Sequence, residues 1–386
     1  MKHEAMSNAE LLARLITFDT VSRNSNMALA DFLCDYLDDT TVRIEKHLSP
    51  DGSKTNLIVS LGPDDPGPER RGLVLSGHMD VVPAEEPDWN SDPFSMKSDG
   101  NSFVGRGSAD MKGFLAIATN AIRNIDGAKL KHPLSLIFTY DEEVGTVGAM
   151  HFAKEWPHPE ALPKAAVIGE PTSLNVIRMH KGHMSMRITL SGVGAHSGYP
   201  HLGKNAIEPA GKILLALSEL RQELQQEEPE YREFFPEVPF VPLNVGTIQG
   251  GVAINVVPNA CVIQLGFRLL PGMQREPMVR RIEDAIRNSV PGEELAVEVV
   301  AESPPLLLDD SVPVYRSACS LVNQEDTHSA SYATDGGWLQ QMGMDCIIWG
   351  PGSIEVAHKP NESIPVEDVA RGAELINQMI EKHCRV

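Results

Sequence analysis

The chain has 386 residues, of which 42% are hydrophobic, and this is enough apolar sequence for more than one globular domain. Its formal net charge of −20 argues against a nucleic-acid partner, because nucleic-acid phosphates would be repelled. The acidic charge is compatible with a cationic or zwitterionic substrate, although a general gain in solubility explains it more simply.

We expect a cytoplasmic protein without a membrane span. The sequence contains no apolar run of about 18 residues, the length that a spanning helix needs. Its first residues lack the basic and then apolar pattern of a signal peptide. The five cysteines are odd in number and form no C-x-x-C pair, so we expect reduced thiols.

The first third of the chain alternates helical and extended patterns. Ser7 is a candidate N-cap of the first helix, and Glu10 completes a capping box three residues later. Short aliphatic runs between the helices are typical of buried strands. This alternation predicts an α/β fold with a mixed, mostly parallel sheet and helices on both faces. The expected helices cover residues 7–16, 28–37 and 111–125, and the expected strands cover residues 56–60, 73–76, 134–140 and 165–168.

The pattern changes near residue 182, and residues 184–190 alternate in polarity as a strand with one buried face does. The order strand, helix, strand, strand, helix then predicts a small antiparallel α+β insert. Buried-strand character returns after residue 294. We therefore expect a discontinuous domain of residues 1–181 and 294–386, interrupted by an inserted domain of residues 182–293. The other expected elements are helices over residues 206–226, 277–288 and 366–383 and strands over residues 244–248, 261–270 and 346–349.

Five side chains with metal-binding atoms follow apolar runs: His78, Asp110, Glu143, Glu170 and His358. An open α/β sheet builds its binding site from residues at the carboxyl ends of such strands. Two imidazoles and three carboxylates are too many for one tetrahedral ion, but they suit two zinc ions that share a carboxylate. The set therefore predicts a two-metal site.

Taken singly, these side chains have simpler explanations. Asp110 precedes a predicted helix and would serve as its N-cap. Glu170 would belong to a surface turn, and His358 lies in a polar loop where histidine is usually just exposed. Only their coherence as a set favours the metal site.

Two further carboxylates stand beside the candidate ligands. Asp80 and His78 are two residues apart, so on an extended backbone their side chains point the same way, and Asp80 could hydrogen-bond the imidazole of a ligand. Glu142 and Glu143 are adjacent, and one could bind metal while the other takes a proton from water. The pattern alone leaves their order open; we assign Glu143 as the ligand and Glu142 as the base.

The combination of motifs closely resembles the two-zinc exopeptidase and deacylase family, which includes acetylornithine deacetylase, succinyl-diaminopimelate desuccinylase, aminoacylase and glutamate-releasing carboxypeptidase. The motifs stand in family order and span nearly the whole chain. They are Ser76-Gly-His-Met-Asp-Val-Val-Pro, Gly105-Arg-Gly-Ser-Ala-Asp-Met-Lys-Gly, Asp141-Glu-Glu-Val-Gly, Gly169-Glu-Pro-Thr and Ala357-His-Lys-Pro-Asn-Glu.

The resemblance implies the fold of the zinc exopeptidases and the roles of the candidate ligands. One zinc ion would take His78 and Glu170, the other would take Glu143 and His358, and Asp110 would bridge them. The implied cofactors are two Zn²⁺ ions, for which Co²⁺ is an expected substitute.

The resemblance also implies catalytic and substrate-binding residues. Asp80 would orient His78, and Glu142 would be the general base. The insert would be a lid and dimerisation domain whose His196 reaches a neighbouring active site and stabilises the oxyanion. Asn255 and Arg268 would hold the carboxylate or carbonyl of the substrate, although a surface position is the commoner explanation for an arginine.

Within this family, residues 15–26 and the Pro351-Gly-Ser-Ile segment look most like acetylornithine deacetylases. The expected reaction converts N2-acetyl-L-ornithine and water to L-ornithine and acetate, in arginine biosynthesis. The expected partners are a small N-acyl amino acid and a second copy of the chain, with no nucleic acid and no membrane. A deacylase, desuccinylase or carboxypeptidase for another N-acyl amino acid remains an alternative, and a non-catalytic metal-binding scaffold is a more remote one.

Overall fold

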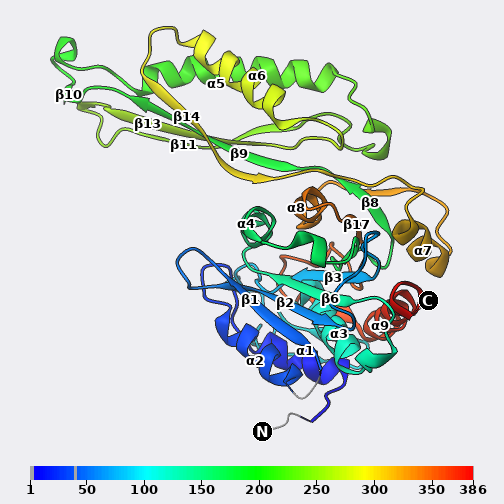
Figure 1. Ribbon diagram of the computed structural model, residues 1–386. Helices are drawn as coiled ribbons and strands as arrows, with labels where there is room; N and C mark the ends of the chain where they lie inside the picture. The colour runs from blue at the N-terminus through cyan, green and yellow to red at the C-terminus, as the bar shows by residue number, and fades with distance from the viewer. Residues whose placement is uncertain (1–3, 39–40, 386) are drawn as a thin grey trace. The chain divides into compact units, whose positions relative to one another are not determined.

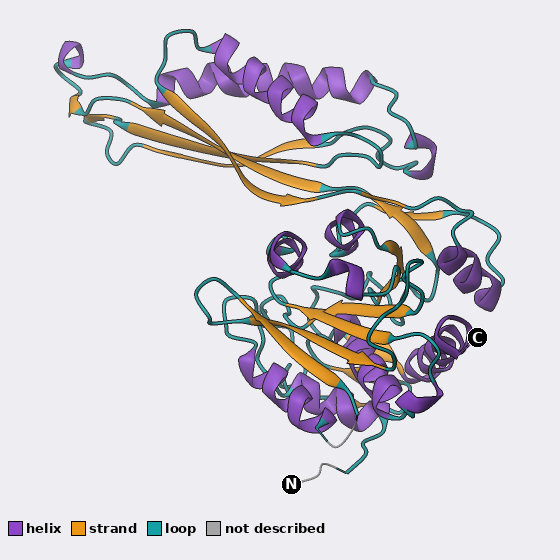
Figure 2. Ribbon diagram, in the orientation of Figure 1, coloured by secondary structure: helices purple, strands orange, loops and turns teal. Residues whose placement is uncertain are grey.

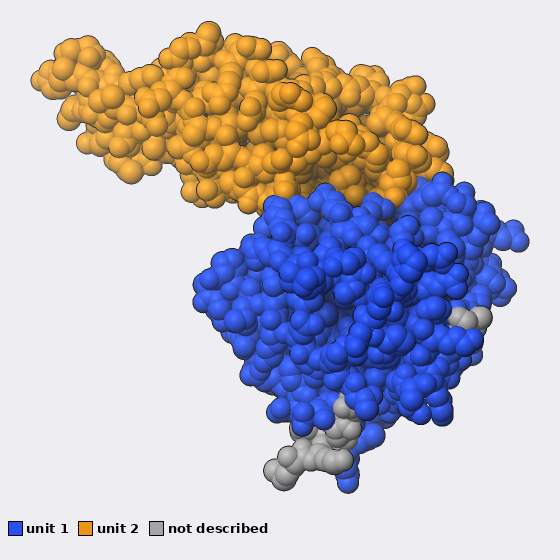
Figure 3. Space-filling view, in the orientation of Figure 1, with its two compact units in different colours: residues 1–179, 308–329, 334–386 blue, residues 180–307, 330–333 orange. Residues whose placement is uncertain are grey.

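A computed structural model describes residues 4–38 and 41–385 of the chain. It divides into two compact units, one of residues 1–179, 308–329 and 334–386 and one of residues 180–307 and 330–333 (Figure 3). We expected the insert to end at residue 293, whereas the second unit continues to residue 307. The reason is strand β14 (Leu295–Ser303), which pairs antiparallel with β9 (His183–Ser191) and so belongs to the sheet of the second unit.

The first unit is built on the strands β1-β2-β6-β3-β7-β17, which are the first six in the order of a nine-stranded mixed sheet. Four of these strands, β6, β3, β7 and β17, run parallel to one another. The strand β2 pairs antiparallel with β6, and β1 pairs antiparallel with β2. This arrangement confirms the predicted α/β class. The strands are β1 (Arg43–Leu48), β2 (Thr55–Leu61), β3 (Leu73–His78), β6 (Leu134–Thr139), β7 (Ala165–Ile168) and β17 (Asp345–Ile348).

Helices cover both faces of this sheet (Figures 1 and 2). Helices α1, α2, α3 and α9 pack on one face, and α4 and α8 lie over the other. The capping box at the start of α1 is confirmed, because the Ser7 side chain accepts from the Glu10 N–H and the Glu10 side chain accepts from the Ser7 N–H. The helices of this unit are α1 (Asn8–Ile16), α2 (Met27–Leu37), α3 (Gly113–Arg123), α4 (Val147–Glu155), α7 (Pro313–Val322), α8 (Gly336–Gln341) and α9 (Val366–Ile380).

The parallel strands bring distant segments to one edge of the sheet. All six residues of β3 and of β6 are buried, as continuous aliphatic runs predict. In the β3–β6 pair, His78 lies opposite Thr139, and in the β3–β7 pair Ser76 lies opposite Ile168. The segments that follow these strands therefore start side by side, at the carboxyl edge where α/β proteins place their sites.

The segment before α3 departs from the expected helix. We expected a helix directly after Asp110, but regular α3 begins at Gly113, and residues Ser108–Lys112 form a single π-type turn with non-helical backbone angles at Asp110 and Met111. The Asp110–Met111 peptide bond is cis. The turn presents the Asp110 side chain to the sheet edge instead of using it as an N-cap.

The second unit is a four-stranded antiparallel sheet in the order β11-β13-β9-β14, with two helices packed on it. Alternate residues of β9 are buried, which confirms a strand with one covered face. The short strands β10 and β12 pair with each other at one end of this unit (Figure 1). The remaining elements of the unit are α5 (Ile207–Gln226), α6 (Arg275–Ser289), β10 (Ala195–His196), β11 (Leu243–Gly250), β12 (Val256–Val257) and β13 (Ala260–Phe267).

None of the helices in residues 4–38 and 41–385 is both long and apolar enough to cross a membrane.

Several short strands complete the chain. The strand β18 pairs with β5 and thereby joins a segment near the C-terminus to one near residue 104. The short strands are β4 (Lys97–Ser98), β5 (Ser102–Val104), β8 (Ile177–His180), β15 (Leu306–Leu307), β16 (His328–Ala330) and β18 (Ser363–Pro365).

Candidate metal centre

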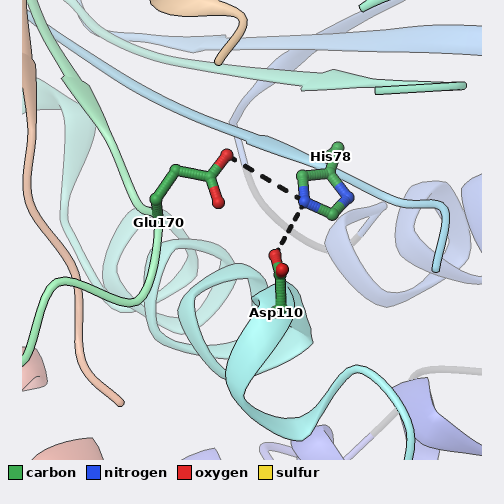
Figure 4. A group of neighbouring side chains, drawn as sticks. All are labelled: His78, Asp110 and Glu170. Atoms are coloured by element: carbon green, nitrogen blue, oxygen red, sulfur yellow. Dashed lines mark hydrogen bonds and ion pairs between the residues drawn. The ribbon is translucent and has the colours of Figure 1, made fainter. Parts of the chain in front are cut away.

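The first cluster at the sheet edge joins His78, Asp110 and Glu170 (Figure 4). His78 is the last residue of β3, and Glu170 follows β7 by two residues. Nε2 of His78 lies 3.0 Å from Oδ1 of Asp110 and 4.0 Å from Oε1 of Glu170. All three side chains are buried, so their charges are shielded from water. One cation placed among them would be bound by one nitrogen and two carboxylates.

The second cluster joins Asp110, Glu143 and His358. Nε2 of His358 lies 2.9 Å from Oε2 of Glu143 and 3.3 Å from Oδ2 of Asp110. The two oxygens of Asp110 thus face different imidazoles, Oδ1 towards His78 and Oδ2 towards His358. This is the geometry that a carboxylate shared by two cations requires.

The electrostatics of the clustered carboxylates also favour the binding of cations. Burial, and next the charge of Asp110, raise the pKa of Glu170 well above its usual value. Burial and the charge of Asp110 likewise raise the pKa of Glu143 to about 7. Oε1 of Glu143 is buried without a hydrogen-bond partner. Negative charge and acceptor atoms are therefore in excess here, and nitrogen and carboxylate ligands are those that zinc and similar divalent ions take.

The two imidazoles are the counter-charges that the protein itself supplies. Hydrogen bonds with Asp110 and then with Glu143 raise the pKa of His358 to about 10. Burial lowers the pKa of His78, but its contacts with Asp110 and Glu170 outweigh this and raise the pKa well above the usual value. Because only a neutral imidazole binds a metal ion, cation binding to this centre has to release protons.

Asp80 contacts His78 differently from the sequence-based expectation. Nδ1 of His78 donates to the backbone carbonyl of Asp80 at 2.9 Å, while the nearest carboxylate oxygen lies 3.7 Å away. Because a carbonyl only accepts, Nδ1 carries the proton and Nε2 faces the cluster. Asp80 therefore contacts the His78 ring most closely through its main chain.

The carboxylate of Asp80 instead holds the neighbouring loop. Its oxygens accept the backbone N–H of Glu142 at 3.0 Å, the N–H of Glu143 at 3.3 Å and the Ser22 hydroxyl at 2.7 Å. Two successive N–H groups on one carboxylate fix the direction in which both glutamate side chains leave the backbone. Asp80 thus positions the Glu142–Glu143 pair.

Glu142 lies beside the cluster without belonging to either group of three. Burial, followed by the charge of Glu170, raises its pKa well above the usual value. The charges of Asp335 and Glu143 act in the same direction. A carboxyl group with a raised proton affinity next to a metal centre can accept and return a proton.

Two acidic residues at this edge were not assigned from the sequence. Asp335, at the start of α8, accepts a hydrogen bond from the Thr139 hydroxyl, and burial raises its pKa to about 6. Glu362 accepts hydrogen bonds from the segment that carries Asp110. The only signal in the sequence was their place in Thr334-Asp-Gly-Gly and in the motif that ends at Glu362.

The three remaining predicted residues lie in the second unit. His196 in β10 pairs with Val256 in β12, and the carbonyl of Asn255 accepts the Ser197 N–H at 2.9 Å, so His196 and Asn255 lie together. Arg268 follows the end of β13, where Phe267 lies opposite Met184 at the start of β9. After burial, the charge of Arg268 also lowers the pKa of His183.

Comparison with known proteins decides the family. A profile of Peptidase family M20/M25/M40 matches residues 74–382. The chain belongs to this family. An acetylornithine deacetylase of Yersinia pseudotuberculosis is 34% identical over 374 residues, which cover 95% of this chain and 93% of that protein. An M20 family metallo-carboxypeptidase of Sulfolobus solfataricus shares the fold, with a TM-score of 0.77 and 17% identity over 98% of this chain and 99% of that one.

A second structural relative is the YXEP protein of Bacillus subtilis, described as a dinuclear metal binding peptidase of the M20 family. It has a TM-score of 0.65 and 15% identity over 97% of this chain and 96% of that chain. Membership in the M20 family makes this protein a metal-dependent hydrolase that acts on amide bonds of small molecules. The two clusters that share Asp110 are its candidate metal centre.

The contacts of Asp80 predict how this M20 hydrolase responds to Asp80→Asn. The NH₂ group of the asparagine would face the backbone N–H of Glu142 or Glu143, and two donors cannot hydrogen-bond each other. We therefore expect the loop to shift. We expect metal affinity and turnover to fall about 10- to 100-fold, as for other residues that orient ligands. A chromophoric chelator competition and a steady-state assay would measure both. Ser22→Ala removes only the hydroxyl and is the matched control; equal effects of the two changes would contradict the role of Asp80.

Proposed function

We propose that this M20 hydrolase is a zinc-dependent deacetylase that converts N2-acetyl-L-ornithine and water to L-ornithine and acetate. The observation that carries the proposal is the pair of clusters sharing Asp110, with Glu142 beside them. The substrate rests on the relatives named acetylornithine deacetylase, which match 95% of this chain at 34% identity. All five cysteines are free thiols, which fits the reducing cytoplasm, where we place the reaction in arginine biosynthesis.

We assign the candidate ligands to two cations. His78 and Glu170 would hold one, Glu143 and His358 the other, and Asp110 would bridge them through its two oxygens. The mixture of imidazole and carboxylate ligands suits Zn²⁺, and Co²⁺ accepts the same donors. When bound, the cation pair would polarise the acyl carbonyl and lower the pKa of a nearby water.

Glu142 would carry the proton during hydrolysis. Its carboxylate accepts a proton from the attacking water as the new C–O bond forms, and returns it to the amine as the C–N bond breaks. The proton count closes, because both protons of the water end on the leaving amine, which departs as an ammonium group, and its oxygen ends in acetate. The proximity of Glu170, Glu143 and Asp335 supports this role, because their charges raise the proton affinity of Glu142.

Arg268, Asn255 and His196 would recognise the substrate. Arg268 is suited to pair with the α-carboxylate of ornithine, since a guanidinium binds a carboxylate through two parallel hydrogen bonds. His196 and Asn255 are exposed and lie on neighbouring backbone segments, and both side chains carry N–H groups that could donate to the developing oxyanion. The net charge of −20 is compatible with the cationic side chain of this substrate.

The second unit also supports a homodimer. Arg268 follows the β13 residue opposite the start of β9, whereas His196 lies in the segment beyond the end of β9. Nine residues of strand at roughly 3.3 Å each separate the two groups by about 30 Å. One small substrate cannot contact both within one copy, so we propose that His196 and Asn255 serve the active site of a second copy.

A substrate panel tests the proposal. We expect the zinc-loaded protein to hydrolyse N-acetylornithine with a larger kcat/KM than N-succinyl-diaminopimelate, N-acetylmethionine or folyl-glutamate. Activity on one of the others without activity on N-acetylornithine would replace the substrate but keep the reaction class. Bound zinc without hydrolysis of any N-acyl amino acid would favour a metal-binding scaffold.

Glu142→Ala tests the proton carrier. The change removes the base but none of the five assigned ligands, so we expect turnover to fall about 10²- to 10⁴-fold while two metal ions per chain remain bound. Metal analysis of the purified variant and steady-state kinetics measure the two effects. Glu143→Ala is the control that should lose metal as well as activity. A Glu142→Ala enzyme with near-normal turnover would refute the assignment.

Mixing two inactive variants tests the shared active site. His196→Ala and Glu142→Ala chains are each expected to be nearly inactive as homodimers. After random exchange of subunits, half of the dimers are mixed and each has one complete site, so about a quarter of the sites should recover. Activity after mixing and refolding together measures this. Unchanged inactivity in a preparation that forms mixed dimers would show that His196 acts within its own copy.

A further inference from the structure

Glu362 is a buried carboxylate whose hydrogen bonds go to one short segment. Oε1 accepts the backbone N–H groups of Ala109 and Asp110, each at 2.9 Å. Oε2 accepts the N–H of Gly107 at 2.9 Å and Nη1 of Arg106 at 3.0 Å. Both oxygens are thus occupied by donors from residues 106–110, including the backbone of the proposed bridging ligand.

The main chain around Glu362 reinforces this connection. Its carbonyl accepts the Gly105 N–H at 2.9 Å, and the next residue, Ser363, pairs with Val104 between β18 and β5. Nη1 of Arg106 also donates to the carbonyl of Lys359 at 3.3 Å. The segment that follows His358 is therefore fastened to residues 104–110 by both backbone and side-chain bonds.

The conformation of the bound segment fits this carboxylate. Gly107 has a φ of +80°, where glycine is favoured, and a Cβ there would lie 2.7 Å from Cγ1 of Val81. This backbone turns the N–H groups of Gly107, Ala109 and Asp110 towards one point. A carboxylate has enough acceptor positions to bind all three together with a guanidinium.

The position of Glu362 in the chain links two ligands. It stands four residues after His358, and it binds the backbone N–H of Asp110, whose Oδ2 lies 3.3 Å from Nε2 of His358. His358 is about half exposed and lies on a loop, and the side chains that it contacts, Asp110 and Glu143, are themselves candidate ligands. A metal centre needs its ligands held to within about 0.5 Å, which such a loop achieves only through a rigid support.

We propose that Glu362 is a positioning residue for the metal centre, which holds the Asp110 turn and the His358 loop in the relative placement that two cations require. The proposal rests on the metal centre of the proposed function but not on its substrate. A negative charge placed beside a site already rich in carboxylates has an electrostatic cost. The buried guanidinium of Arg106 offsets part of this cost, and a carboxylate offers enough acceptor positions to bind it together with three backbone N–H groups.

Glu362→Gln is the test, because glutamine keeps the shape but sets an NH₂ group against backbone N–H donors. In the metal-free protein we expect faster hydrogen–deuterium exchange of the amides of residues 105–112. We also expect Co²⁺ affinity to fall about 10- to 100-fold, with a changed visible absorption spectrum of bound Co²⁺. Glu362→Asp keeps both oxygens on a shorter side chain and should restore part of the affinity.

Tyr36→Phe is the matched control for the loss of a buried hydrogen bond. The Tyr36 hydroxyl accepts the Met6 N–H at 3.0 Å and donates to Asn120 at 2.9 Å, within the same unit but in the N-terminal helices. We expect this variant to lower thermal stability without changing Co²⁺ affinity or its spectrum.

The outcomes separate the possibilities. Unchanged exchange at residues 105–112, or faster exchange with unchanged Co²⁺ affinity and spectrum, would overturn the proposal. Equal losses of affinity in Glu362→Gln and Tyr36→Phe would also overturn it, since the effect would then be general destabilisation. Failure to hydrolyse N-acetylornithine would refute the proposed substrate alone, because neither exchange nor Co²⁺ binding involves a substrate.

Discussion

The excess of buried negative charge around Asp110 is the constraint on which the site depends. Asp110 contacts both imidazoles through different oxygens, and Glu143 and Glu170 complete the two clusters. Burying this many carboxylates is unfavourable unless cations or protons offset them, which is why the pKa of Glu143 is raised to about 7. The same excess gives Glu142 its raised proton affinity. Metal binding and proton transfer thus arise from one electrostatic arrangement.

Such an arrangement needs supports that keep the charges in place. The parallel order of β6, β3 and β7 sets the starting points of three ligand-bearing segments at one edge. Loop residues then need further anchors, and two carboxylates provide them by accepting backbone N–H groups. Asp80 binds the Glu142–Glu143 backbone, and Glu362 binds the turn that carries Asp110. The segments that carry Asp110 and Glu143 are therefore held by the carboxylates of Glu362 and Asp80.

Much of the fold could be predicted because local patterns and burial agree along most elements. The capping box of α1 and the aliphatic runs of β3 and β6 are examples. Residues 111 and 112 were predicted wrongly as the start of a regular helix, because Met111 and the residues after it have good helical spacing while the turn that contains them is held by a residue about 250 positions away. Strand β14 was not predicted, because most of its side chains are exposed or only half-buried. Its pairing with β9 decides where the second unit ends.

The sequence by itself determined the class of fold, the family and the set of side chains able to bind metal, because each follows from patterns within short segments. Only the tertiary structure decided how those side chains meet. Which oxygen of Asp110 faces which histidine, and that Asp80 binds a loop more closely than an imidazole, depend on contacts between segments far apart in the chain. The role of Glu362 has the same origin. Hydrogen bonds to backbone N–H groups have a sequence pattern when they are local, as in the capping box of α1. Between segments far apart in the chain they have none, so the sequence could not predict the contacts of Glu362.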